Sequence, residues 1–109
     1  MERFIKGDIV VVPFPFSDLS SSKKRPALVL ANLTGDVIIL CQITSQFVRD
    51  IYAITLHESD FISGSLNKES NIRPNRIFTA DKNIINRKIG TINSVILKKV
   101  IDTLYGIIQ

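Results

Sequence analysis

The sequence contains very few of the residues that build disulfides, metal sites or histidine-dependent active sites. Its 109 residues include one cysteine, Cys41, and one histidine, His57. A single cysteine excludes an internal disulfide and a cysteine-rich zinc site, and a single histidine excludes acid–base catalysis by a histidine pair within one chain. Among the acidic residues, Glu58 and Asp60 stand close together, and we expect them to flank a loop. We therefore predict no metal and no cofactor.

Long apolar runs and glycine-rich loops are absent as well. The longest apolar runs, residues 27–31 and 37–41, have five residues each, whereas a membrane span needs about 18. The glycines are scattered, so no glycine-rich phosphate loop is present. Lys6 and Asp8 interrupt the N-terminus before any long apolar region, which argues against a signal peptide. We expect a cytoplasmic protein with no membrane segment, formed by a single domain over residues 1–109.

What the sequence does contain is a large number of β-branched residues. It has 18 isoleucines and 8 valines, which favour strands. Its 45% of hydrophobic and 22% of charged residues exclude a disordered chain. The excess of 14 basic over 10 acidic residues favours polyanionic partners such as nucleic acid. Scattered charges that merely keep the protein soluble explain the same excess.

Turn residues divide most of the chain into short strands. The segment 17–24 is expected to be a polar loop, residues 60–67 a second loop, and residues 80–83 a single helical turn. Pro74 predicts either a bulge or an edge position for its strand. Apolar and alternating runs predict strands at residues 9–12, 25–31, 37–44, 51–56, 72–79 and 87–92.

The C-terminal segment has the pattern of an amphipathic helix. Asn93 or Ser94 can cap its start, and Gly106 is expected to fray its end. Five or six short strands with one such helix predict a mainly β fold, a small and strongly bent barrel. The apolar positions of the helix are Leu97, Val100, Ile101, Leu104, Tyr105 and Ile108.

Two polar features stand out from this apolar background. The first is the basic run at residues 23–26, where Lys23 and Lys24 precede Arg25 at the start of a predicted strand. Lysines act on phosphates as point charges, whereas a guanidinium can make two parallel hydrogen bonds to one phosphate. The second feature is a polar face on the predicted strand 37–44, since residues 42, 44 and 46 alternate with apolar or small neighbours. A solvated charge run remains the alternative for the first.

A hairpin between the strands at 25–31 and 37–44 would join these features. Its turn would lie at residues 32–36, and the midpoint of positions 25 and 44 falls inside that turn. Arg25 and Thr44 would then lie at the same end of the sheet. A guanidinium beside a hydroxyl, next to basic residues, is suited to binding a phosphodiester.

Seven short motifs occur along the chain: GDIV at residues 7–10, FPFSD at 14–18, KRPALVL at 24–30, QITSQ at 42–46, SNIRP at 70–74, IFTADK at 77–82 and KIG at 88–90. In this order they resemble the MazF/PemK-type toxins of bacterial toxin–antitoxin systems, and the resemblance covers nearly the whole chain.

The resemblance implies an SH3-like barrel that forms a homodimer and is inhibited by a cognate antitoxin protein. It also implies a metal-independent endoribonuclease that cuts single-stranded RNA at a short sequence. The catalytic pair implied by the family is Arg25 and Thr44. The RNA-binding residues would be Ser17, Lys23, Lys24, Asn32 and Gln46, while Phe14, Phe16, Arg73, Arg76 and Lys88 are further candidates.

Two other functions remain open. A small barrel can bind nucleic acid without cutting it, and some members of the wider fold poison DNA gyrase, because fold does not determine function. If the chain is a ribonuclease, the 2′-hydroxyl of the RNA is the expected nucleophile, since no reactive cysteine, metal site or histidine pair is present.

Overall fold

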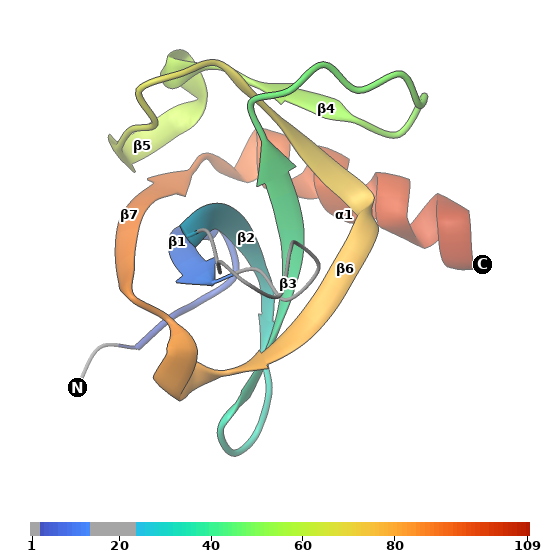
Figure 1. Cartoon of the computed structure of the whole chain (residues 1–109). Coiled ribbons are helices and arrows are strands. Elements are labelled where there is room, and N and C mark those ends of the chain that lie inside the picture. The colour runs from blue at the N-terminus through green and yellow to red at the C-terminus, as the bar shows by residue number, and fades with distance from the viewer. Residues whose placement is uncertain (1–2, 14–23) are drawn as a thin grey trace, which may run out of the picture.

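The computed structural model describes residues 3–13 and 24–109, and within them the chain forms one curled antiparallel sheet (Figure 1). Neighbouring strands follow the order β4-β6-β3-β2-β1-β7-β5. The strands are β1 (Asp8–Pro13), β2 (Lys24–Asn32), β3 (Val37–Thr44), β4 (Ile54–Leu56), β5 (Phe61–Gly64), β6 (Ser70–Asp81) and β7 (Arg87–Ile92), and the helix α1 (Ser94–Ile108) follows them. The prediction of a mainly β, strongly bent fold with a C-terminal helix is therefore confirmed.

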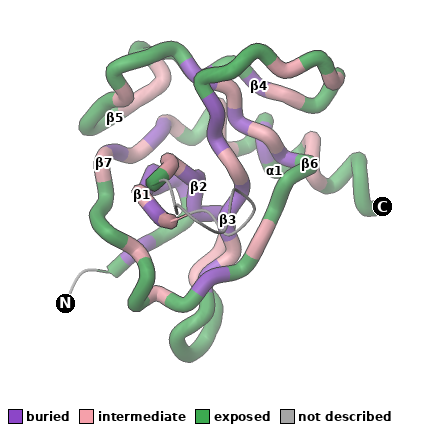
Figure 2. The backbone as a smooth tube through the Cα atoms, in the orientation of Figure 1, coloured by how far each residue is buried: buried purple, intermediate pink, exposed green. Residues whose placement is uncertain are grey.

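Both faces of the central strands are buried, because the sheet curls around one face and α1 covers the other. Ile9 and Leu28 belong to a cluster that includes Val100 of α1, whereas Val10 and Val29 belong to a second cluster. Successive residues of a strand point to opposite faces, so the continuous apolar run of β1 supplies both clusters. Figure 2 shows buried positions gathered on β1, β2 and β3, with the outer turns exposed. The helix covers one face, and the curled sheet encloses the other.

Most strand predictions agree with the structure; the exceptions are the strand predicted at 51–56, which starts late, the strand predicted at 72–79, which is longer, and β5, which the sequence patterns do not predict. β3 and β7 match the predicted residues, while the predicted strand 51–56 begins only at Ile54. The carboxylate of Asp50 causes this delay, because its Oδ1 accepts hydrogen bonds from the backbone N–H groups of Tyr52 and Ala53, each at 3.0 Å, and so stabilises a turn.

The predicted loop 60–67 is wrong in its first half, because a 3₁₀ turn at Glu58–Asp60 leads into β5. β5 pairs with β7, and the partner strand lies far along the chain. Gly64 makes the close approach possible: its φ is +69°, and a Cβ there would lie 2.0 Å from the carbonyl oxygen of Ile89.

Pro74 produces a bulge, as one of the two predictions for it required. β3 pairs Cys41 with Ile77 and then Gln42 with Arg73, so the residues between them on β6 are extra. The edge prediction also holds locally: β6 lies between β3 and β4, but β4 pairs only with residues 70–72, so among the described strands only β3 runs beside β6 at Pro74. The strand is also longer than the predicted 72–79.

The helix begins where the sequence predicts and reaches Ile108, the last of its predicted apolar positions. Asn93 is its N-cap, and the side-chain oxygen accepts a hydrogen bond from the N–H of Ile96 at 2.9 Å. The expected fraying at Gly106 is wrong, since the helix continues to Ile108. The short turn predicted at 80–83 is a 3₁₀ helix at Lys82–Ile84. Among the described helices, none has the length and apolar character that a membrane crossing requires.

Candidate functional site

The β2–β3 hairpin has the predicted register next to the candidate site. Ala27 pairs with Gln42 and Leu28 pairs with Cys41, so continuation of the same register sets Arg25 opposite Thr44. The register shifts by one residue only nearer the turn, between Val29 and Ala31. The hairpin prediction is thus confirmed for the segment that positions the site.

Arg25 and Thr44 line one pocket of about 250 Å³. We call it the Arg25–Thr44 pocket. Three segments form it: the start of β2, the end of β3, and the segment that connects β5 to β6. Its lining residues are Lys24, Arg25, Pro26, Ile43, Thr44, Ser45, Leu66, Asn67, Lys68 and Ser70.

The Thr44 hydroxyl is buried and oriented by the backbone that follows β3. The residue is 7% exposed, and its Oγ1 accepts a hydrogen bond from the N–H of Gln46 at 3.1 Å. A hydroxyl has one proton to donate in addition to its acceptor positions. The Gln46 N–H uses an acceptor position only, and the Thr44 hydroxyl donates to no group in the described part of the chain, so its proton is available to a ligand. The carbonyl of Gln46 in turn accepts from Asn71 Nδ2 at 3.3 Å.

Arg25 is half-buried and has no charged partner in the described part of the chain. Within residues 3–13 and 24–109, no ion pair or side-chain hydrogen bond involves its guanidinium or the neighbouring Lys24. By contrast, Arg73 makes an ion pair with Asp50, with Nη2 and Oδ2 2.9 Å apart. A partly desolvated, unneutralised guanidinium in a concave site is suited to binding an anion.

The connection between β5 and β6 forms a wall of the pocket that sequence reasoning missed. Leu66 packs against the core, and the buried Ser70 donates its hydroxyl proton to the carbonyl of Lys68 at 3.1 Å. These contacts hold Asn67 and Lys68 at the pocket. Nothing in the local sequence distinguishes Lys68 from other surface lysines. Its position at the pocket depends on how the connection between β5 and β6 packs against β2 and β3, which are distant in the sequence.

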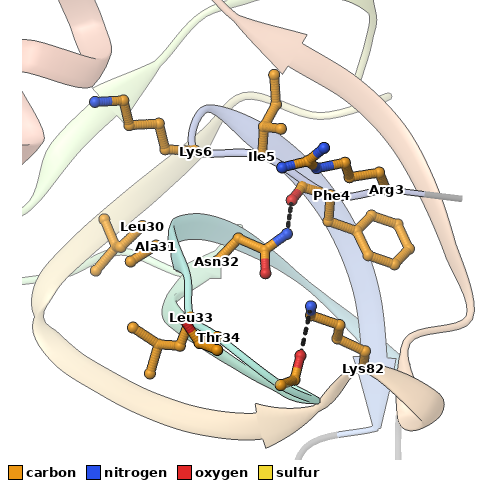
Figure 3. A pocket seen from close by; sticks show the side chains of 11 residues that line it. Arg3, Phe4, Ile5, Lys6, Leu30, Ala31, Asn32, Leu33, Thr34 and Lys82 are labelled. Atoms are coloured by element: carbon orange, nitrogen blue, oxygen red, sulfur yellow. Dashed lines mark hydrogen bonds between the residues drawn. The ribbon is translucent and has the colours of Figure 1, made fainter.

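Not all predicted RNA-binding residues lie at this pocket. Lys24 lines it and Gln46 lies two residues beyond Thr44, but Asn32 lies at the opposite end of β2. There the Asn32 side chain donates a hydrogen bond to the carbonyl of Phe4 (Figure 3). Ser17 and Lys23, like Phe14 and Phe16, fall outside the described residues.

The cavity beside Asn32 is the larger one, at about 880 Å³. Two of its polar side chains bond to the protein backbone: Asn32 as described, and Lys82, whose Nζ donates to the carbonyl of Gly35 at 2.8 Å (Figure 3). Arg3 and Lys6 also line this cavity (Figure 3) and form no ion pair in the described part of the chain, so a cation without a partner does not by itself separate the two cavities. The Arg25–Thr44 pocket is the better candidate because it combines such a cation with a hydroxyl that a backbone N–H orients.

The other reactive residue types do not form a site. Burial raises the pKa of the Cys41 thiol to about 12, so the nucleophilic thiolate is scarce at neutral pH. His57 lies at the surface with Nδ1 2.9 Å from a carboxylate oxygen of Glu69. Within the described ranges, no group of three or more His, Cys, Asp or Glu side chains is arranged to hold a metal ion.

Solved structures with the same curled sheet are toxins. An endoribonuclease in complex with its cognate antitoxin from a mycobacterial species is 12% identical with a TM-score of 0.76, covering 95% of this chain and 93% of that one. The *Mycobacterium tuberculosis* toxin MazF-mt6 is 16% identical with a TM-score of 0.71, covering 91% and 93%. A MazE–MazF structure from *Deinococcus radiodurans* is 21% identical with a TM-score of 0.73, covering 94% and 93%. At these identities the likeness establishes the fold, which is that of the MazF toxins.

The sequence establishes the family. Residues 5–108 match the family described as PemK-like, MazF-like toxin of type II toxin–antitoxin systems, and the chain belongs to that family. No curated protein matches the sequence.

Proposed function

We propose that this MazF-like toxin is an endoribonuclease that cuts single-stranded RNA at a short sequence without a metal ion. The observation that carries the proposal is the meeting of Arg25 and Thr44 in one pocket. One supplies a cation with no carboxylate partner among the described residues, and the other supplies an oriented hydroxyl. Both groups can donate hydrogen bonds to the oxygens of a phosphodiester.

The reaction begins with the RNA's own 2′-hydroxyl. Its oxygen attacks the adjacent phosphorus, the bond from phosphorus to the 5′-oxygen breaks, and the products are a 2′,3′-cyclic phosphate and a 5′-hydroxyl. The proton of the 2′-hydroxyl is lost and the departing 5′-oxygen gains one. DNA lacks this nucleophile, so we expect single-stranded DNA to bind and to remain intact.

Arg25 and Thr44 act through charge stabilisation. The guanidinium binds the non-bridging phosphate oxygens, on which negative charge accumulates in the transition state, and the Thr44 hydroxyl adds a second donor. One preorganised donor of this kind is worth about 3–4 kcal/mol. Arginine keeps its proton at neutral pH and is a poor general base, so we assign Arg25 to charge stabilisation and assign no residue as the general base.

The remaining parts of the proposal concern partners. Lys24 and Gln46 lie at or next to the pocket and would bind RNA there, with Ser17, Lys23 and Asn32 as further RNA-binding residues. We also propose that the chain is cytoplasmic, forms a homodimer and is inhibited by a cognate antitoxin. Support for the last point comes from two of the similar structures, in which the toxin is bound to its antitoxin.

The test is incubation of the purified protein with a long single-stranded RNA in EDTA, followed by mapping of all new ends. We expect discrete cuts that carry 5′-hydroxyl groups, and no cuts with Arg25→Ala prepared in parallel. Intact RNA across many sequences would contradict the proposal. RNA that is bound and left whole would favour a binding module, and altered DNA supercoiling would favour a gyrase-directed toxin.

A further inference from the structure

A second pocket, of about 700 Å³, lies next to the Arg25–Thr44 pocket. We call it the flanking pocket. The two pockets share Lys24, Arg25 and Asn67, and the flanking pocket adds Arg87 and Lys88 from the start of β7. Arg25 therefore stands between two concave surfaces. A polymer bound at Arg25 can continue into the second one.

The sheet register explains why residues 25 and 87 come together. β1 is the strand between β2 and β7, with Val12 paired with Arg25 and Val11 paired with Arg87. The backbone is fixed at this point, because the N–H of Asn86 donates to the carbonyl of Val11 at 2.9 Å. Strands two apart in a sheet lie about 10 Å from each other. Because Val11 and Val12 point to opposite faces, the register brings the backbones of residues 25 and 87 together, and it is the flanking pocket, at the starts of β2 and β7, that both residues line. From there the two arginines can reach consecutive parts of one extended ligand.

The charges of the flanking pocket are all of one sign. Four cationic residues and no acidic residue line it. In the part of the chain that the structure describes, none of the four forms an ion pair, whereas Arg73 pairs with Asp50 and Lys98 pairs with Asp102. Cations without acidic partners in a concave surface create a positive potential that attracts a polyanion. When the polyanion binds, its condensed counterions are released into solution.

We propose that the flanking pocket binds a phosphodiester that neighbours the scissile one, through Arg87 and Lys88. The RNA backbone then crosses Arg25 and continues over the start of β7. The inference rests on the proposed ribonuclease function, adds Arg87 as an RNA-positioning residue and assigns the candidate Lys88 to the same site. Arg87 and Lys88 supply affinity and alignment, whereas the chemistry stays with Arg25 and Thr44.

The experiment compares two double variants with equal changes in net charge. Arg87→Gln/Lys88→Gln removes the two cations of the flanking pocket, and Lys98→Gln/Lys99→Gln removes two exposed cations of α1. Binding is measured over a range of salt concentrations with an RNA that carries a 2′-O-methyl group at the mapped cleavage position, which removes the nucleophile. Cleavage of the unmodified RNA is measured in parallel.

We expect the Arg87/Lys88 variant to bind RNA at least tenfold more weakly. The slope of log K against the logarithm of the salt concentration should become smaller in magnitude by about 1.4, the value for two phosphate contacts on a single strand. Its KM should rise while kcat stays within about threefold of the parent. The Lys98/Lys99 variant should behave like the parent. Replacing one flanking linkage of the RNA by an uncharged methylphosphonate should weaken binding to the parent and leave binding to the Arg87/Lys88 variant unchanged.

The outcomes separate this inference from the proposed function. If the parent cuts RNA and the Arg87/Lys88 variant binds it as tightly as the parent does, the flanking pocket is not an RNA site and the ribonuclease stands. Equal losses in both double variants would also overturn the inference, because they would reflect net charge alone. If the parent neither binds nor cuts RNA, both proposals fail.

Discussion

The two ends of β2 present polar side chains in opposite ways. At the Asn32 end, the amide of Asn32 and the ammonium of Lys82 donate hydrogen bonds to backbone carbonyls of the protein. At the Arg25 end, the Thr44 hydroxyl keeps its proton available, and the Arg25 guanidinium has no ion-pair partner among the described residues. Hydrogen-bond donors that are already satisfied stabilise a fold, whereas donors left free in a pocket are available to a ligand. Arg3 and Lys6 at the Asn32 end also form no ion pair among the described residues, but the Arg25 end combines such a cation with an oriented hydroxyl. This combination makes the smaller cavity the better functional candidate.

The largest effect we expect is from Arg25→Ala. It should reduce RNA cleavage by about 100- to 1000-fold, because one preorganised donor is removed. The free energy of unfolding should change by less than about 0.5 kcal/mol, since the side chain makes no ion pair within the described residues. Single-turnover cleavage rates and urea denaturation measure the two quantities. Activity within a few-fold of the parent would remove Arg25 from the proposed catalytic pair.

Asp8→Ala should lower the stability of the fold and leave RNA cleavage unchanged, the opposite of the effects expected for Arg25→Ala. The side chain is almost fully buried; its Oδ2 accepts from the N–H of Ile5 at 3.0 Å and its Oδ1 from the hydroxyl of Thr91 at 2.9 Å. Removing the acceptor leaves two donors without it, and we expect the variant to lose about 1–3 kcal/mol of unfolding free energy. Cleavage per folded molecule should be unchanged. A thermal melt measures the loss of stability, and an activity assay at low temperature measures cleavage by the folded variant. An unaltered melting temperature would contradict the stabilising role of Asp8.

Thr44→Val removes the hydroxyl at nearly constant volume. We expect cleavage to fall about tenfold, as for the loss of one hydrogen bond of roughly 1.4 kcal/mol. Loss of the acceptor for the Gln46 N–H should lower stability only slightly. Thr44→Ser keeps the hydroxyl and serves as the matched control. Equal turnover by the valine and serine variants would reduce Thr44 to a structural residue.

Asn32→Ala tests the other end of the strand. Losing the hydrogen bond to Phe4 should lower the unfolding free energy by about 1 kcal/mol. RNA affinity of the same variant, measured at a temperature where it is fully folded, tests the predicted RNA contact of Asn32. Weaker binding would show that RNA reaches this end, and parental affinity would assign Asn32 to the fold alone.

The smallest effect concerns pH. The hydrogen bond from Arg73 lowers the pKa of Asp50 below its usual value, and the N–H of Tyr52 and the Asn75 amide act in the same direction. Because the folded-state pKa is lower, Asp50 stabilises the folded protein above about pH 4 and loses this contribution as the pH falls through the folded-state pKa. Asp50→Asn should flatten this part of the stability profile. If the unfolding free energy of Asp50→Asn falls at acid pH as steeply as that of the parent, the acid sensitivity belongs to other carboxylates.

The sequence predicts the β2–β3 hairpin well because both strands and their turn are local. Its register follows from the position of the turn, so the meeting of Arg25 with Thr44 could be inferred before the structure was known. β5 could not be predicted from the sequence, because it forms a strand only through its pairing with β7 and the close approach of the two backbones at Gly64. The same reason applies to the wall at Asn67 and Lys68, which only long-range packing brings to the pocket.

The central place of β1 in the sheet has a consequence for how the toxin is made. β1 pairs with β7 nearly 80 residues later, and the Asp8–Thr91 hydrogen bond closes the same long loop. Such distant pairings form late and slowly. A nascent chain that ends before β7 can already pair β2 with β3, yet it lacks the strand that completes the flanking pocket and the helix that covers half of the core. A nascent chain interrupted before β7 therefore leaves an apolar surface open to proteases.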